Sequence, residues 1–537
     1  MKTKYKFYTI IHILAICTCM QIVVTSCGDD DTDLAETPTI SISQQEPLLA
    51  RSGETIEVPV SFNIPGGNKE LVVFLGSGPL DIISLETDAN SFTYELKVPF
   101  DVEEGEELVY EFLVSDQDGQ DSQRATFTID AAIYDTVMIE GEELYKVDIP
   151  EGGTLFSGSS LTFAKNRKYL VTEPLTFEQG SRLSIEEGAI LYMEKPTQAE
   201  EENVSFIVNS GTDVSIVGTA TNPVVMTPSS TLTGDPEPKD WNQLRLNGVT
   251  NATVKYLRTE YASDGFRAND LDTSNTVEYI QSFKSDDEGM YFDGGNVVAK
   301  YLVSTDSNDQ SYRLADFNGK LQFGIAQLSQ AYKDTYACEI RGSSELIISN
   351  FTLVGPGIEA GDSYGFRFRG GSNGKVYNSI ASNFNRRSVR IDKETFASET
   401  LEGPTVLAYS YVINTGQAFR DDRSSTDITN LNFFHGFLNS EDMFINNFNN
   451  NVTGLTPNGS SEEDNQVGVP IFIPTLENIP GIGVNDFIPD ATVTAKQNHD
   501  PNTVDAAFTS VTFVGAVEDA ENDWTVGWVK NPDGTIR

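Results

Sequence analysis

The residues best suited to chemistry in this 537-residue chain are arginines that gather late in the sequence. Arg367, Arg369 and Arg390 lie in two short stretches where apolar and charged residues alternate. In a strand, this alternation turns the apolar residues inward and the arginines outward. A planar guanidinium holds a carboxylate or sulfate through two parallel hydrogen bonds, so a stacked row would match a repeating anionic polymer. The candidate ligand strip consists of Arg313, Arg367, Arg369 and Arg390. Ion pairing with surface carboxylates is the competing interpretation.

Acidic turns provide the second group of candidate ligands. Asp286, Asp287 and Glu288 are consecutive, and Asp306 and Asp309 share a later turn. Carboxylate oxygens are the ligands that Ca²⁺ prefers, so the first three residues are weak candidates for a calcium site. Solvated turns are the alternative interpretation. The sequence indicates no other cofactor.

Other metal and thiol chemistry lacks the necessary residues. His435 and His499 are the histidines beyond the first 26 residues, and they are far apart in the sequence. No set of His, Cys and carboxylate residues has the spacing of a zinc site. Cys338 lies in a strand-like segment, and we expect it to be a small buried apolar residue.

Two apolar patterns recur from about residue 134 onward, at intervals of roughly 21 to 30 residues. Short apolar and aromatic segments of the first pattern begin at Val254, Val277, Val298 and Leu321. The second pattern contains the arginines of the strip. Two strand phases in each repeat predict the coils of a right-handed parallel β-helix, where every coil buries its inward residues by stacking on its neighbours.

The stretch before the repeats has a different pattern. From residue 37 to residue 133, short alternating strands are separated by turn residues, which predicts a β-sandwich. This stretch resembles the immunoglobulin-like modules of bacterial lipoproteins, which implies an immunoglobulin-like sandwich. The chain is therefore predicted to be all-β, with a sandwich over residues 37–133. A parallel β-helix with a C-terminal closing segment follows over residues 134–537.

The first 26 residues are predicted to be a signal peptide. Lys2, Lys4 and Lys6 precede an apolar run that ends near Val24, which is the usual order of a signal sequence. A permanent membrane-spanning helix is the alternative, but polar residues interrupt the run. Residues 27–36 begin with a cysteine and are rich in aspartate, which describes an acidic tether.

The boundary at residues 24–27, Val-Thr-Ser-Cys, resembles a bacterial lipobox. This resemblance implies that Cys27 carries a diacylglycerol and becomes the mature N-terminus, and several acyl chains make a stable membrane anchor. The acidic run that follows resembles the surface-export signal of Bacteroidota lipoproteins. It implies an outer-membrane protein that faces the exterior.

Three later stretches resemble β-helix lipoproteins of Bacteroidota, a group mostly without assigned biochemistry. They are a tryptophan-bearing coil at 240–248, an acidic turn at 285–289 and a closing segment at 514–528. The resemblance covers roughly residues 140–537. It implies a fold and a location, and it carries over no catalytic residue.

Enzymes with a parallel β-helix offer a further comparison. Pectin-type hydrolases use clustered aspartates, a His-Gly pair and an Arg-Ile-Lys segment. Fragments of this set are present, but His435 follows the Arg-Ile pair at 390–391 instead of preceding it, and Asp392 interrupts the segment. Lyases of this fold would need a basic residue and a cation such as calcium. We predict no catalytic residue, and a polysaccharide lyase or glycoside hydrolase stays the alternative.

The charge of the chain limits its partners. Asp and Glu number 80 against 36 Lys and Arg, for a net charge of −44. Such a chain repels nucleic acids and anionic lipid surfaces. The sequence therefore predicts a non-catalytic binding or scaffold protein on the cell surface, for glycans or other large ligands. An outer-membrane uptake complex is the expected neighbour.

Overall fold

The computed structural model describes residues 35–44, 46–149, 152–195, 203–332, 336–392, 405–414, 419–421, 475–476, 481–489 and 500–537. These residues form two compact units. The first comprises residues up to 47, 55–96 and 108–128, and the second comprises 48–54, 97–107 and 129–537. Helix in the described residues is confined to α1 (Ser230–Thr233) and α5 (Pro501–Val504), so the all-β prediction is confirmed. No helix among these residues is long and apolar enough to span a membrane.

The first unit consists of antiparallel strands. One sheet has the order β1-β3-β6, and β4 pairs with β5 and with β7. Alternation in β3 buries Val58, Val60 and Phe62 on one face. The immunoglobulin-like character of this region stays a prediction. The strands are β1 (Thr39–Ile42), β3 (Thr55–Asn63), β4 (Asn68–Leu75), β5 (Gly78–Ser84), β6 (Ser91–Lys97) and β7 (Glu107–Asp116).

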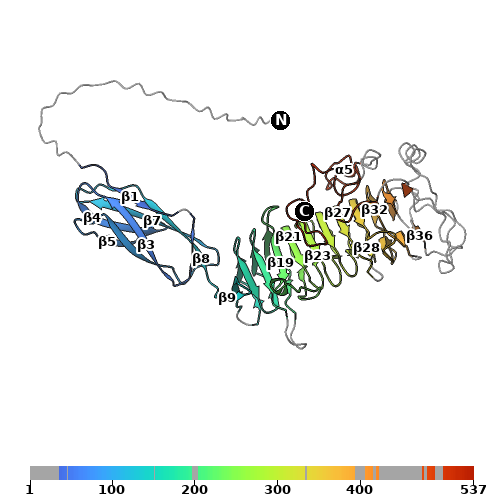
Figure 1. The fold of residues 1–537 in the computed structure, drawn as a ribbon, viewed down its shortest axis with the longest axis horizontal. Coiled ribbons are helices and arrows are strands. Elements are labelled where there is room, and N and C mark those ends of the chain that lie inside the picture. Colours follow the sequence, from blue (N-terminus) through green and yellow to red (C-terminus); the bar gives the residue numbers. More distant parts are fainter. Residues whose placement is uncertain are drawn as a thin grey trace, which may run out of the picture. The chain divides into compact units, whose positions relative to one another are not determined.

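The second unit is a parallel β-helix, as the repeats predicted (Figure 1). Its coils stack into three parallel ladders. Before these coils, β2 (Leu48–Arg51) pairs with the end of β8 (Ala125–Ala132), and β9 (Thr136–Ile139) pairs antiparallel with β10.

Short strands and the first halves of long strands form the first ladder. It contains β12 (Ser160–Phe163), β15 (Arg182–Ile185), β18 (Asp213–Val217), β21 (Thr253–Glu260), β23 (Thr276–Phe283), β25 (Val298–Thr305), β27 (Lys320–Gln327), β29 (Ile347–Val354), β31 (Lys375–Tyr377) and β34 (Val406–Ala408).

The second halves of the same long strands continue the second ladder. Its other strands are β10 (Glu142–Val147), β13 (Lys168–Val171), β16 (Ile190–Met193), β19 (Val224–Pro228), β32 (Ile380–Ser382), β35 (Tyr411–Ile413) and β37 (Thr475–Leu476).

The third ladder contains eleven strands and carries the candidate strip. They are β11 (Thr154–Leu155), β14 (Leu175–Phe177), β17 (Phe206–Val208), β20 (Leu244–Asn247), β22 (Phe266–Asn269), β24 (Met290–Asp293), β26 (Tyr312–Ala315), β28 (Tyr336–Arg341), β30 (Tyr364–Phe368), β33 (Arg387–Ile391) and β36 (Phe419–Asp421).

Side chains of one register fill the interior of the β-helix. On the inner face of the third ladder, each coil contributes one buried apolar residue to a continuous stack. The stack contains Phe266, Met290, Tyr312, Cys338, Phe366 and Val389. Cys338 is therefore a buried free cysteine, as predicted.

A column of aromatic residues marks the bend between the first and second ladders. Tyr256, Tyr279, Tyr301 and Phe323 each have positive φ, which turns the long strand from one ladder into the next. The first three rings stack face to face with centroids 4.3 Å apart. Such a backbone is unusual for a bulky residue, and the repeated stacking holds it in place.

The C-terminal segment, residues 500–537, lies along this bend. Trp528 is fully buried, with its ring 5.7 Å from that of Tyr256. Buried glutamine side chains of the β-helix bond its backbone, as where the amide of Gln281 donates to Lys530 O over 2.7 Å. Figure 1 shows the segment returning beside β21 and β23.

Candidate functional site

The outer face of the third ladder carries a continuous row of polar and aromatic side chains, one from each coil. Adjacent members occupy paired positions in neighbouring strands, which lie about 4.8 Å apart. The row contains Arg245, Arg267, Tyr291, Arg313, Glu339, Arg367 and Arg390. Three residues of the predicted strip therefore share one register, and Arg369 follows two residues after Arg367.

Carboxylates already contact all four arginines of the strip. Arg313 is paired with Glu288, whose side chain is 2% exposed. Arg367 and Arg369 both reach Glu339, at 3.3 and 3.2 Å. The competing interpretation from the sequence, ion pairing, therefore describes the geometry of the strip.

A second acid completes the strip at its far end. Asp392 lies 2.8 Å from Arg367 and 3.0 Å from Arg390. The guanidinium of Arg390 also donates to the hydroxyl of Tyr336 over 3.0 Å. The side chains of Glu339 and Asp392 are almost buried. Burying a carboxylate without a partner is energetically costly, and the arginines that cover these two acids neutralise their charges.

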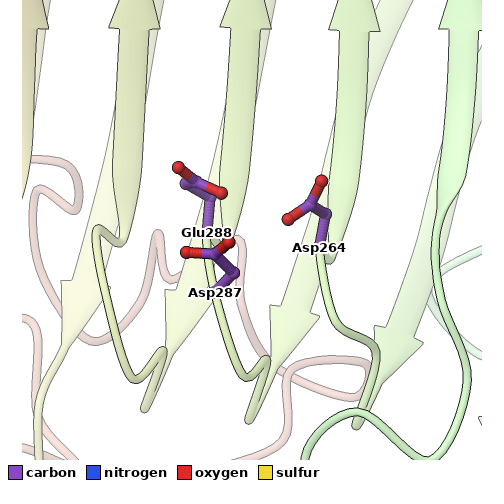
Figure 2. A group of neighbouring side chains, drawn as sticks. All are labelled: Asp264, Asp287 and Glu288. Atoms are coloured by element: carbon purple, nitrogen blue, oxygen red, sulfur yellow. The ribbon is translucent and has the colours of Figure 1, made fainter.

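Three carboxyl groups converge at the turns before β22 and β24 (Figure 2). Oxygens of Asp264, Asp287 and Glu288 lie within 4.8 Å of one another. The backbone positions them, because Gly265 N donates to Glu288 O over 2.9 Å and stacks the two turns. Two of the three predicted calcium ligands are therefore brought together. Asp286 lies apart from them and pairs with Lys239 at 3.6 Å.

Glycines allow these turns to close against the second ladder. A Cβ atom at Gly265 would lie 1.9 Å from Ser282 Oγ, and one at Gly289 would lie 2.1 Å from Ser304 Oγ. Both distances are far below van der Waals contact, so glycine is a steric requirement at both positions. Sequence reasoning missed Asp264, although the pairs Asp264-Gly265 and Glu288-Gly289 recur in the same phase.

Burial and mutual repulsion shift the acidity of this group. Asp309 lies on the next coil, where its N–H donates to Asp287 O over 3.3 Å. Burial, followed by the charges of Asp287 and Glu288, raises the pKa of Asp309 to about 7. Burial also raises the pKa values of Asp264, Asp287 and Glu288, and Arg313 opposes that effect at Glu288. These four residues form the carboxyl cluster, and the pKa of each member is raised above its ordinary value.

Two arginines and a tyrosine border the carboxyl cluster. Arg267 lies 3.4 Å from Asp264 and 4.3 Å from the ring centroid of Tyr291. Arg313 approaches the same ring at 4.7 Å, so the ring lies between two cations. Carboxylates accept hydrogen bonds, guanidinium groups donate them, and an aromatic face packs against apolar C–H groups. This combination suits a ligand that carries many hydroxyl groups.

Several predicted residues have no place in this site. Asp306 accepts hydrogen bonds from the N–H and hydroxyl of Ser329, at 2.7 and 2.8 Å. Cys27, His435 and His499 lie outside the described residues.

Comparison with known proteins identifies the β-helix. A family model described as a pectate-lyase like beta helix domain matches residues 153–263 and 247–434. No curated protein matches the chain.

Three solved structures resemble parts of the chain at low identity. The Family 28 exopolygalacturonase of Yersinia enterocolitica has 10% identity, covers 72% of this chain and 87% of its own, and gives a TM-score of 0.23. Pectate lyase Pel3 from Pectobacterium carotovorum has 9% identity, with 72% and 89% coverage and a TM-score of 0.13. The fibronectin(III)-like modules of Clostridium thermocellum CbhA have 8% identity, with 18% and 98% coverage and a TM-score of 0.14. None of these TM-scores reaches 0.5, so the assignment depends on the family model and the coil geometry.

Proposed function

The chain belongs to the family of pectate-lyase-like β-helix domains, and we propose that it is a non-catalytic carbohydrate-binding protein of the cell surface. The observation that carries this proposal is the row on the third ladder. Seven consecutive coils present one side chain each, over a length of roughly 29 Å at the usual strand spacing. A regular row of this kind matches a polymer with a regular repeat.

The charge balance of the row favours a neutral polymer. Each strip arginine is paired with a carboxylate, so little positive charge is left to attract an anionic chain. The net charge of −44 adds long-range repulsion of polyanions. A paired guanidinium still has N–H groups that can donate, and a paired carboxylate still has lone pairs that can accept. A sugar hydroxyl can form a hydrogen bond with either group. The polymer that fits the paired arginines is therefore neutral, in contrast to the anionic polymer expected for unpaired arginines.

The location is also part of the proposal. A lipid on Cys27 would hold the chain in the outer membrane, and the acidic tether over residues 27–36 would direct it to the exterior. The support is the resemblance of residues 24–27 to a lipobox and of the acidic run to the export signal of Bacteroidota lipoproteins. An outer-membrane uptake complex is the neighbour that such a glycan-binding protein would serve.

A glycan array probed with the chain from residue 35 onward tests the binding proposal. The informative variant is Arg369→Gln with Arg390→Gln, because Arg367 still covers Glu339 and Asp392 and the fold is kept. The matched control is Arg182→Gln, an exposed arginine of the first ladder. We expect retention on neutral glycans that the double variant lowers about tenfold and the control leaves unchanged. No retention, or equal retention by the double variant, would overturn the proposal.

Glycoside hydrolysis is the second candidate, and the raised pKa of Asp309 favours it. A carboxyl group that keeps its proton near pH 7 beside carboxylates is what a general acid requires. One oxygen from each of Asp264, Asp287 and Glu288, however, lies within 4.8 Å of the corresponding oxygens of the other two. The two catalytic carboxyl groups of glycosidases are usually about 5–5.5 Å or 6.5–9.5 Å apart. Release of reducing ends from an array-positive glycan, abolished by Asp309→Asn, would establish hydrolysis in place of simple binding.

A further inference from the structure

A separate polar pocket of about 500 Å³ lies at the turns that follow the long strands, and we infer that it binds one neutral pyranose unit. This inference rests on the proposed function for its ligand class, a carbohydrate, and it adds a second binding site made of other residues. Tyr261, Lys284 and Asp306 are the first residues after β21, β23 and β25, and all three line the pocket. Its volume is within the range of small-molecule sites.

The backbone of the coils fixes the floor of this pocket. Tyr261, Lys284 and Asp306 all have φ between 52° and 57°. The N–H of each residue donates to the next coil, over 2.8, 2.7 and 2.8 Å. Three side chains of different chemistry are therefore held side by side at the spacing of the coils, and ligand binding needs little reorganisation.

Rigid segments form the walls. Pro236 and Pro238 come from the loop after α1, and Pro532 comes from the C-terminal segment. The C-terminal wall is tied to the coils, because Lys530 N donates to Gln281 Oε1 over 2.8 Å. Prolines provide fixed apolar surfaces, against which the C–H face of a sugar ring packs.

The polar groups of the pocket suit hydroxyls and disfavour anions. Within the described part of the chain, the ammonium of Lys284 makes no salt bridge, and it lies 5.2 Å from the ring centroid of Phe283, so it can still turn a donor toward a ligand. Gln330 donates to the hydroxyl of Tyr332 over 2.9 Å, and burial raises the pKa of that tyrosine to about 12, which keeps its own proton in place. Asp235 and Asp306 outnumber the single lysine, so the pocket repels sugar acids and phosphates.

Saturation-transfer NMR with free monosaccharides tests the inference. The chain from residue 35 onward is mixed, at millimolar sugar, with glucose, galactose, mannose, xylose or galacturonate. Lys284→Met keeps a side chain of similar length and removes the ammonium donors, and Lys255→Met is the matched control on a partly exposed, ion-paired lysine. We expect at least one neutral sugar to bind. Lys284→Met should weaken it about tenfold, and Lys255→Met should leave it unchanged.

The outcomes separate this pocket from the row on the third ladder. Loss of array binding in the Arg369→Gln, Arg390→Gln variant concerns the row alone, and loss of monosaccharide signal in Lys284→Met concerns the pocket alone. The inference fails if no neutral sugar gives a signal, if Lys284→Met binds as the parent does, or if galacturonate binds as well as the neutral sugars.

Discussion

Replacing Asp309 by Asn should reduce the pH dependence of stability that the carboxyl cluster imposes. The pKa of Asp309 is raised from its ordinary value of 3.8 to about 7 in the folded chain. Between these two values, the folded state holds a proton that the unfolded state has lost. The free energy of unfolding therefore falls as pH rises from about 4 to about 7, and it levels off above that range.

The difference between 3.8 and about 7 corresponds to about 4 kcal/mol at 1.36 kcal/mol per pH unit. Asp309 is only partly buried, and solvent screening reduces this value to about 2 kcal/mol. Asn cannot ionise and keeps the shape of the side chain. We expect Asp309→Asn to equal the parent near pH 4 and to exceed its stability by about 2 kcal/mol near pH 8.

Urea unfolding followed by circular dichroism across this pH range, with a chelator present, measures the difference between the two chains. Asp286→Asn is the control, because Asp286 lies in the turn of Asp287 and Glu288 but outside the carboxyl cluster, paired with Lys239. Its curve should follow that of the parent. A variant Asp309→Asn that is less stable than the parent at every pH, or that keeps the parent's slope, would refute the cluster as described.

Four further outcomes are expected. Arg167→Met should destabilise the β-helix by about 3–5 kcal/mol in urea unfolding, because it leaves the buried carboxylate of Glu104 without a cation. The second substitution Glu104→Gln should restore most of the lost stability. Trp528→Ala should lower the free energy of unfolding by about 3–5 kcal/mol in the same assay, because it leaves a cavity where the C-terminal segment packs on the coils. Calcium should raise the melting temperature slightly through Asp287, and Asp287→Asn should remove that effect in differential scanning fluorimetry. Cys27→Ala should move the protein from the membrane fraction to the soluble fraction, and a protein still in the membrane would contradict lipidation.

The β-helix could be predicted because its coils repeat, but the number of ladders could not. The repeats showed two strand phases, whereas the long strands serve two ladders by turning at Tyr256, Tyr279 and Tyr301. Tyrosine is a common strand residue, so its presence does not predict a left-handed backbone conformation. The turn arises from stacking between coils, which becomes visible only when the coils are superposed.

The sequence predicted which arginines of the candidate site share a register, but it did not predict which carboxylates they contact. Arg313, Arg367 and Arg390 could be aligned because each occupies the same phase of the repeat. Their partners could not be assigned, because Glu339 itself belongs to the row and Asp392 lies two coils after it, directly past β33. Whether an outward arginine meets an acid depends on which side chains stand next to it across the ladder. Local sequence spacing does not contain that information.

The C-terminal segment decides which outer face is available to a ligand. The sequence placed a closing segment at the end of the chain, and in the structure its described residues run back along the bend between the first and second ladders. The polar side chains Gln281 and Gln322 face outward there and are nevertheless fully buried, because they bond the backbone of that segment. The corresponding polar residues of the third ladder keep part of their surface, with 25% of the Arg313 side chain and 36% of Arg369 exposed. An outward polar residue on the bend therefore serves the fold, and one on the third ladder remains within reach of a ligand.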